Sequence, residues 1–109
     1  MRILVDVQEL SWDEAWNLTR KTLNYTNHTV MPEALEKWPV EMFEALLPRH
    51  LQIVGEINRR FMEEVKAKWG DGPKLWGMSL FQEDPFKGIR MGNVALVGSN
   101  KANGVAEIP

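Results

Sequence analysis

The stretch that decides the fold is residues 49–69, RHLQIVGEINRRFMEEVKAKW. Its large apolar side chains recur every three or four residues, and charged or amide side chains fill most of the other positions. This spacing places one apolar stripe along one side of an α-helix. The stripe consists of Leu51, Val54, Ile57, Phe61, Val65 and Trp69. The sequence therefore predicts one long amphipathic helix, with its charged side turned to solvent.

Proline and glycine mark the boundaries of this helix and of the helices before it. Pro48 stands at its start, and the run 70–73 (Gly-Asp-Gly-Pro) ends it. Pro39 suits the first turn of a preceding helix, because the amide proton that proline lacks is unpaired there anyway. Pro32 in the same way predicts a short helix over 32–38. The helix after Pro39 is expected to bury Val40, Phe43, Leu46 and Leu47.

The amino-terminal segment carries a helix-start signal. Ser11 and Glu14 have the spacing of a capping box, in which the serine side chain accepts a hydrogen bond from the amide of the glutamate. A helix is predicted from there to about Leu23, and the opening segment 2–6 is expected to be a strand or the tail of a helix. The apolar stripe of the predicted helix consists of Trp12, Ala15, Trp16, Thr19 and Leu23.

The remaining segments predict an α/β arrangement. Residues 24–29 are polar and read as a loop, and residues 74–88 are mixed and loop-like. Ile89–Gly98 is nearly continuously apolar in its second half, the pattern of a strand covered on both faces, and 101–108 is expected to begin a helix. Ile3–Val5 is the one plausible partner strand, so the backbone groups of a lone strand would stay unpaired. The sequence therefore predicts a piece of a larger α/β domain.

Composition limits the function classes. Thirteen basic and fifteen acidic residues give a formal net charge of −2, which argues against general attraction to nucleic acid or an anionic membrane. The chain has no cysteine, and His28 and His50 are its two histidines, so we expect no disulfide and no metal site. We expect no secretory signal in the opening residues, and no apolar run of this sequence reaches the length of about 20 residues that a membrane span requires.

Several motifs occur in the order and spacing of one known family. They are residues 1–6, 12–16, 25–39, 47–54, 56–61, 78–80 and 98–106, with YTNHTVMPEALEKWP at 25–39 as the most specific. On these motifs the chain resembles the glycogen, starch and maltodextrin phosphorylases. The resemblance implies cytoplasmic, allosteric, pyridoxal-phosphate-dependent glycosyltransferases of glycogen metabolism. Such enzymes release glucose 1-phosphate from an α-1,4-glucan by phosphorolysis.

The resemblance also implies a set of substrate-binding residues. His28 matches the active-site histidine, whose main-chain carbonyl faces the anomeric carbon and whose imidazole contacts the 6-hydroxyl of the sugar. A carbonyl dipole there would favour positive charge on the ring in the transition state. Thr29, Ala34 and Glu36 match positions that line a pocket beside that carbon. Asn103, Gly104 and Val105 match a turn under the glucose.

A second group resembles the oligosaccharide storage site on the surface of some family members. It consists of Asn58, Arg60, Glu83 and Lys87. Gly55 stands where those members place an aromatic ring, so a stacking platform for sugar would be lost.

The resemblance finally implies that the chain is one part of an enzyme. Residues 1–109 are expected to be a single partial domain, the late part of the first of two Rossmann-like domains in a GT-B fold. The lysine that carries the cofactor belongs to the second domain and has no counterpart here, so we expect no cofactor on this chain alone and no activity. The expected partners are the glucan, phosphate and the rest of the enzyme. The alternative is a non-catalytic module that self-associates, binds another phosphorylase chain or binds glucan.

Overall fold

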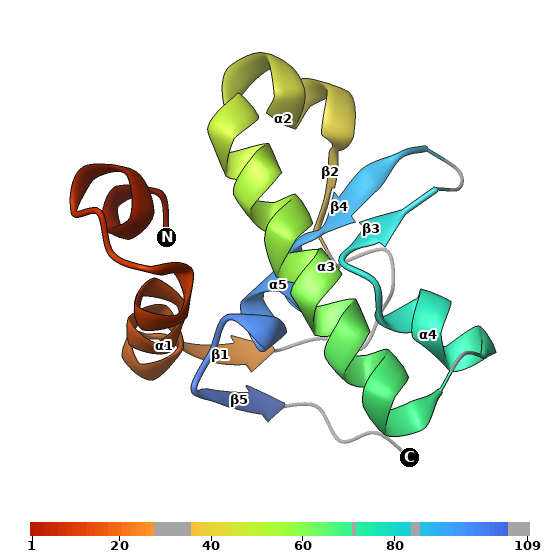
Figure 1. The fold of residues 1–109 in the computed structure, drawn as a ribbon. Helices are drawn as coiled ribbons and strands as arrows, with labels where there is room; N and C mark the ends of the chain where they lie inside the picture. Colours follow the sequence, from red (N-terminus) through yellow and green to blue (C-terminus); the bar gives the residue numbers. More distant parts are fainter. Residues whose placement is uncertain (28–35, 71, 84–85, 105–109) are drawn as a thin grey trace.

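The long helix α3 (Pro48–Trp69) organises the molecule. The computed structural model describes residues 1–27, 36–70, 72–83 and 86–104, and α3 crosses the centre of this structure (Figure 1). Its 22 residues confirm the predicted amphipathic helix, with Pro48 in its first turn. Gly70 ends it with a φ of 76°, a conformation that glycine adopts readily, and its amide donates to the carbonyl of Lys66.

The amino-terminal elements lie on one side of α3 (Figure 1). They are a five-residue π-helix, η1 (Ile3–Val7), and α1 (Trp12–Thr22). The capping prediction is confirmed, because the Ser11 hydroxyl accepts from the Glu14 amide at 3.3 Å. Arg49 donates to both carboxylate oxygens of Asp6, at 2.7 and 2.8 Å, and so ties η1 to the start of α3.

Five short strands form two small sheets within the described residues. One is a parallel pair of β1 and β5, and the other is antiparallel in the order β2-β4-β3. The strands are β1 (Asn24–Asn27), β2 (Lys37–Pro39), β3 (Phe81–Gln82), β4 (Gly88–Arg90) and β5 (Lys101–Gly104). The remaining helices are α2 (Val40–Leu46), α4 (Pro73–Met78) and α5 (Met91–Val97). The described residues are thus mostly helical with small sheets, an α/β arrangement.

The core lies between α3 and the elements that surround it. Ile53 and Ile57 of α3 cluster with Leu80, which is fully buried just before β3. Partly buried apolar side chains from α1, α3, β3, α5 and the amino terminus pack against this cluster: Met1, Trp12, Trp16, Val54, Phe81, Val94 and Val97. The surrounding elements are therefore held in place by packing against the apolar side chains on one side of α3.

The prediction for Ile89–Gly98 is wrong. Only Gly88–Arg90 form a strand, and Met91–Val97 form the helix α5. A short apolar run is compatible with a buried strand or with a helix, and periodicity alone does not separate them. Packing decides here, because Val94 and Val97 lie three residues apart on the side of α5 that meets the core, whereas Leu96 is 50% exposed.

Several local predictions also fail. Residues 24–27 and 101–104 were expected in a loop and a helix but pair as β1 and β5, because tertiary pairing overrides weak local propensity. Lys37 and Trp38 lie in β2, not in a helix. The segment predicted to be loop-like contains α4 and β3. In α2, Phe43 is buried as expected, but Leu46 and Leu47 are exposed.

Candidate functional site

Two motifs of the predicted site meet at the end of the parallel sheet. In the pairing of β1 with β5, Thr26 lies opposite Asn103 and Asn27 lies opposite Gly104. Parallel strands end at the same edge of a sheet, where α/β proteins commonly bind ligands. Asn103 and Gly104 therefore lie beside the residues that directly precede His28. His28 itself, with Thr29, Ala34 and Val105, falls outside the described residues.

Polar contacts fix the register of this strand pair. The side-chain oxygen of Asn24 accepts a hydrogen bond from the amide of Lys101 at 3.2 Å. The amide of Asn100 donates to the carbonyl of Leu23 at 2.7 Å. Both contacts lie at the beginning of the two strands, where they support the pairing of Asn24 with Lys101. Asn24, which the sequence predicted only as part of a loop, thus has a defined structural role.

Glu36 lies in a hollow between the two sheets. The hollow has a volume of about 340 Å³ and is lined by residues of β1, β2, α4, β4 and α5: Tyr25, Glu36, Lys37, Gly77, Arg90, Gly92, Asn93 and Leu96. The carbonyl of Glu36 accepts from the amide of Met91 at 3.1 Å. Phenol, carboxylate, amide and guanidinium groups can hydrogen-bond a ligand rich in hydroxyl groups. The structure thus brings Glu36 into the same hollow as Tyr25 of β1.

Arg90 lines one wall of this hollow, and no motif in the sequence predicted it. Its Nη1 donates to the carbonyl oxygens of Gly77 at 3.2 Å and Ser79 at 3.1 Å. The side-chain amide of Asn93 donates to the same Ser79 oxygen at 3.3 Å. The sequence predicts one strand over Ile89–Gly98, and this prediction does not assign the polar side chains Arg90 and Asn93 to a face. A helix beginning at Met91 would have placed Arg90 at its amino-terminal boundary.

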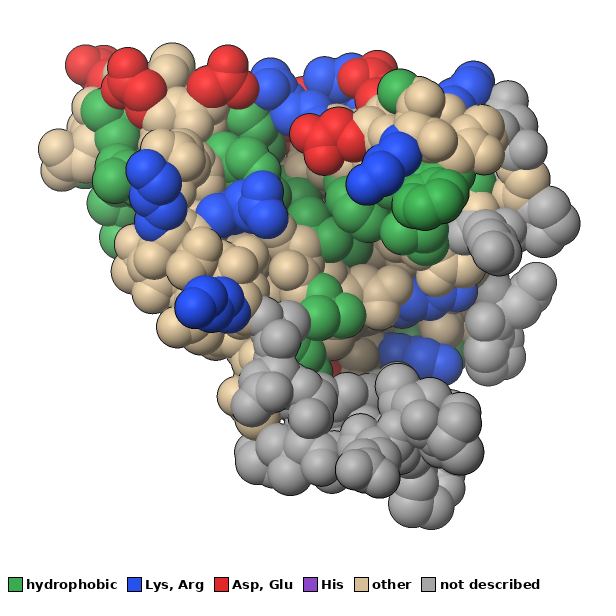
Figure 2. Space-filling model, turned by 90° about the horizontal axis from the view of Figure 1, so that it is seen from below, with side chains coloured by type: hydrophobic (Ala, Val, Ile, Leu, Met, Phe, Trp, Pro, Cys, Tyr) green, Lys and Arg blue, Asp and Glu red, His purple; other side chains and the backbone are tan. Residues whose placement is uncertain are grey.

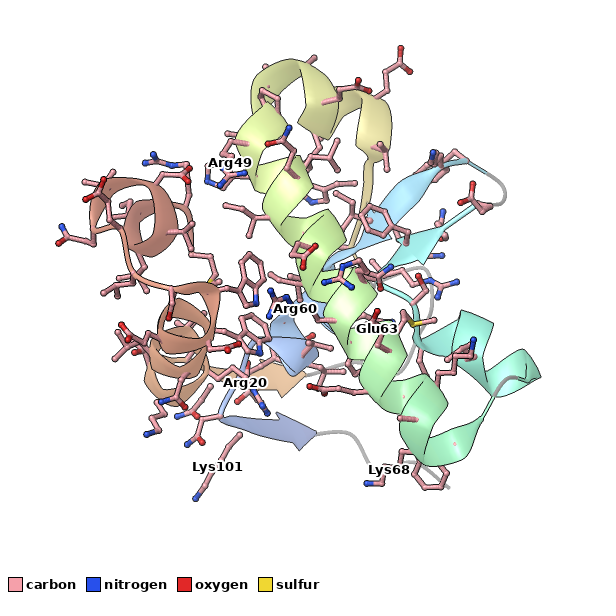
Figure 3. The ribbon with its side chains drawn as sticks, in the orientation of Figure 1. Arg20, Arg49, Arg60, Glu63, Lys68 and Lys101 are labelled. Atoms are coloured by element: carbon pink, nitrogen blue, oxygen red, sulfur yellow. The ribbon has the colours of Figure 1, made fainter. Side chains whose placement is uncertain are left out.

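Asn58 and Arg60, two residues of the predicted storage site, make different contacts in the structure. The side-chain oxygen of Asn58 accepts from the amide of Leu80 at 2.9 Å. Arg60, two residues along α3 and so roughly 200° around the helix, turns toward α1. There its guanidinium lies 4.9 Å from the ring centroid of Trp12 (Figure 3). Glu83 and Lys87 are exposed in the connection between β3 and β4.

The position of Gly55 bears on the same site. A Cβ added there would meet no atom within 4 Å. Gly55 has no side chain that could stack on a sugar ring. Asn58, in contrast, supports the fold through Leu80, and this contact occupies its side-chain oxygen.

Ion pairs cover the outer side of α3. Glu56 accepts from Arg59 at 2.7 Å and from Arg60 at 2.8 Å, and these hydrogen bonds hold the pKa of Glu56 at about 2. The Arg49 guanidinium likewise lowers the pKa of Asp6. These charges compensate one another on the surface, away from the hollow that contains Glu36. Among the described side chains, no three of His, Cys, Asp or Glu gather as a metal would require.

Two larger open hollows expose apolar surface. One, of about 830 Å³, lies between α1 and α3, where Figure 3 shows Arg20, Arg60 and Glu63. The other, of about 510 Å³, is lined by side chains such as Phe43, Ile53 and Val94. On the face that Figure 2 shows, apolar surface is visible between groups of charged side chains. No helix in the described ranges has the length and apolar character of a bilayer span.

Comparison with known proteins gives one consistent result. The sequence model described as carbohydrate phosphorylase matches residues 1–109. The chain is 56% identical to the muscle form of glycogen phosphorylase from Mus musculus and 55% identical to that from Oryctolagus cuniculus. It is 54% identical to the brain form from Homo sapiens. Each match covers 99% of this chain but only 13% of the relative's length.

Proposed function

Because this chain belongs to the carbohydrate phosphorylase family, we propose that it forms part of an α-glucan phosphorylase and contributes residues to its glucosyl site. The reaction is phosphorolysis of the terminal glucosyl unit of an α-1,4-glucan, which yields glucose 1-phosphate. The observation that carries the proposal is the pairing of Asn27 with Gly104. The two paired residues are 77 positions apart in the chain, and each belongs to a family motif: one motif continues into His28, and the other contains Asn103 and Gly104.

Each site residue has a role in this proposal. The main-chain carbonyl of His28 faces the anomeric carbon and favours the positive charge that develops there, while its imidazole binds the 6-hydroxyl. Asn103, Gly104 and Val105 form the turn under the sugar. Thr29, Ala34 and Glu36 line the pocket beside the anomeric carbon. The exposure of Glu36 and its place in the hollow of about 340 Å³ support its assignment.

The proposal assigns this chain to the late part of the first domain of a cytoplasmic GT-B enzyme. A parallel pair of four-residue strands is marginal by itself, because three or more strands are usually needed for stability. The chain also spans only 13% of the length of its relatives. Additional strands and the second domain would then come from the rest of the enzyme.

Pyridoxal 5′-phosphate, the proposed cofactor, would serve through its phosphate group as a proton donor and acceptor, while the phosphate of the product would come from inorganic phosphate. A lysine that binds such a cofactor is normally held in a pocket that lowers its pKa. The lysines whose side chains the structure describes are all exposed: Lys21, Lys37, Lys66, Lys68, Lys87 and Lys101. They do not fit the cofactor, and we assign its binding to the other domain of the enzyme.

A chimera tests the proposal. The 109 residues replace the matching segment of the muscle enzyme from Oryctolagus cuniculus, and phosphorolysis of glycogen is measured. We expect an active chimera and no turnover by the 109-residue chain alone. His28→Ala should lower kcat/KM roughly tenfold to a hundredfold, the effect of one lost hydrogen bond to substrate. His50→Ala, on the exposed side of α3, is the matched control. A folded but inactive chimera, or equal effects of both substitutions, would contradict the proposal.

A second candidate is a module that associates with another phosphorylase chain or with its own copies. The exposed apolar side chains favour it, because Leu46 is 71% exposed and Trp69 is 68% exposed. Light scattering during size-exclusion chromatography would show oligomers that dissociate on dilution. A monomer at every concentration, with or without a full-length phosphorylase, would remove this candidate.

A further inference from the structure

One continuous segment, residues 88–104, contacts both described parts of the proposed site. Its first strand, β4, pairs with β2, and Arg90 lies opposite Lys37. Its last strand, β5, pairs with β1, and Gly104 lies opposite Asn27. The helix α5 joins the two strands and follows β4 without an intervening residue. Residues 88–104 therefore form a bracket, here called the β4–α5–β5 bracket.

Hydrogen bonds attach each end of the bracket to the site. At the first end, the amide of Met91 donates to the carbonyl of Glu36 at 3.1 Å. At the other end, the amide of Asn100 donates to the carbonyl of Leu23 at 2.7 Å, just before β1. The seven residues of α5 form a stiff spacer about 10 Å long. The length and orientation of α5 thus set the separation of Glu36 from Asn103 and Gly104.

Arg90 fixes the first end of the bracket to the rest of the fold. Its amide donates to the carbonyl of Leu80 at 2.7 Å, and its Nη1 donates to the carbonyls of Gly77 and Ser79. The carbonyl of Gly77 lies in the last turn of α4, where helix carbonyls lack intrahelical partners. β4 has only three residues, so its ladder alone is a weak anchor. The guanidinium supplies the additional contacts that orient the start of α5.

We propose that Arg90 is a positioning residue of the glucosyl site. It acts through the bracket, by holding Met91 against Glu36 and by fixing the direction in which α5 leads to β5. This inference rests on the proposed function for its effect on catalysis, but its structural part concerns only the described residues. Asn93 supports the same point, because it donates to the Ser79 carbonyl that Arg90 also contacts.

Kinetics of the chimera test the catalytic part. Arg90→Met keeps the length of the side chain but removes its donors, and small displacements of positioned groups are costly in rate. We expect kcat to fall about tenfold, with a smaller change in KM, and Arg90→Lys to recover part of the loss because its ammonium can donate to both carbonyls. Arg59→Met, which removes exposed ion pairs with Glu56 and Glu63, should leave kcat unchanged.

Hydrogen exchange of the 109-residue chain tests the structural part independently of activity. The amide of Met91 should exchange faster in Arg90→Met than in the unchanged chain, and Arg59→Met should have no such effect. If the chimera itself is inactive, the proposed function fails, whereas the exchange of Met91 still decides the role of Arg90. Unchanged exchange at Met91 overturns the inference. A lower melting temperature of the Arg90→Met chimera with unchanged kcat also overturns it, since Arg90 would then only stabilise the fold.

Discussion

Leu80 gives the sharpest test of how this chain is held together. Its side chain is fully buried against Ile53 and Ile57 of α3. Both of its backbone groups are bonded, the amide to Asn58 at 2.9 Å and the carbonyl to the amide of Arg90 at 2.7 Å. Leu80→Ala keeps these backbone bonds and leaves a cavity in the core. Such substitutions cost about 2–5 kcal/mol, and the complete burial of Leu80 favours the upper half of that range.

This loss is large compared with the stability of the whole chain. A folded chain of this length has a free energy of unfolding of roughly 5–16 kcal/mol, at about 0.05–0.15 kcal/mol per residue. Urea unfolding, followed by tryptophan fluorescence, measures the change, since Trp12 and Trp16 pack against the Leu80 cluster. With an m-value of about 1–3 kcal/mol/M, the midpoint should fall by roughly 1–5 M at an unchanged m-value.

Leu46→Ala is the matched control for this experiment. It makes the same chemical change on α2, where Leu46 is exposed, so the free energy of unfolding should change by at most about 0.5 kcal/mol. Equal effects of the two substitutions, or a loss below about 1 kcal/mol for Leu80→Ala, would refute the assignment of the core.

Two further predictions concern the helices. The pKa of Glu56 is about 2 in the folded chain, below its ordinary 4.5, because Arg59 and Arg60 donate to it. The ionised carboxylate of Glu56 therefore stabilises the fold fully above about pH 4.5. This stabilisation is lost as the pH falls toward 2, where the carboxylate becomes protonated. The difference in melting temperature between the unchanged chain and Glu56→Gln should therefore shrink from pH 6 to pH 2, and a constant difference would contradict this reasoning. Ser11→Ala should cost about 0.5–2 kcal/mol in chemical unfolding, because it removes the acceptor of the Glu14 amide, whereas Ser11→Asp should preserve stability. Equal losses in both variants would show that this cap is unimportant.

The helices α3 and α1 were predictable because their signals are local. The apolar stripe of α3 repeats over more than five turns, and the contact between Ser11 and Glu14 spans only three residues. Such patterns need no distant partner to be recognised. The structure keeps both elements close to the expected bounds, with α3 starting at Pro48 and α1 ending at Thr22.

The elements that hold the site could not be predicted in the same way. β1 and β5 are polar and short, and each becomes a strand only beside the other. The paired residues, such as Asn24 and Lys101, are 77 positions apart in the sequence. α5 is a helix because Val94 and Val97 meet the core, which the apolar run alone does not reveal. Conversely, the motifs named His28, Glu36, Asn103 and Gly104 as candidates without giving their arrangement. The pairing of β1 with β5 brings Asn103 and Gly104 beside Asn27. Glu36 lies in the same hollow as Tyr25.

The same contacts connect the core to the proposed site. The carbonyl of Leu80 binds the amide of Arg90, and the next amide in the chain, that of Met91, binds the carbonyl of Glu36. Leu80 in the core is therefore connected through two hydrogen bonds and one peptide unit to a residue of the hollow. Neither short sheet is large enough to resist such a displacement by itself. We therefore expect a substitution in the core at Leu80 to alter the position of Glu36 while the motif residues themselves remain unchanged.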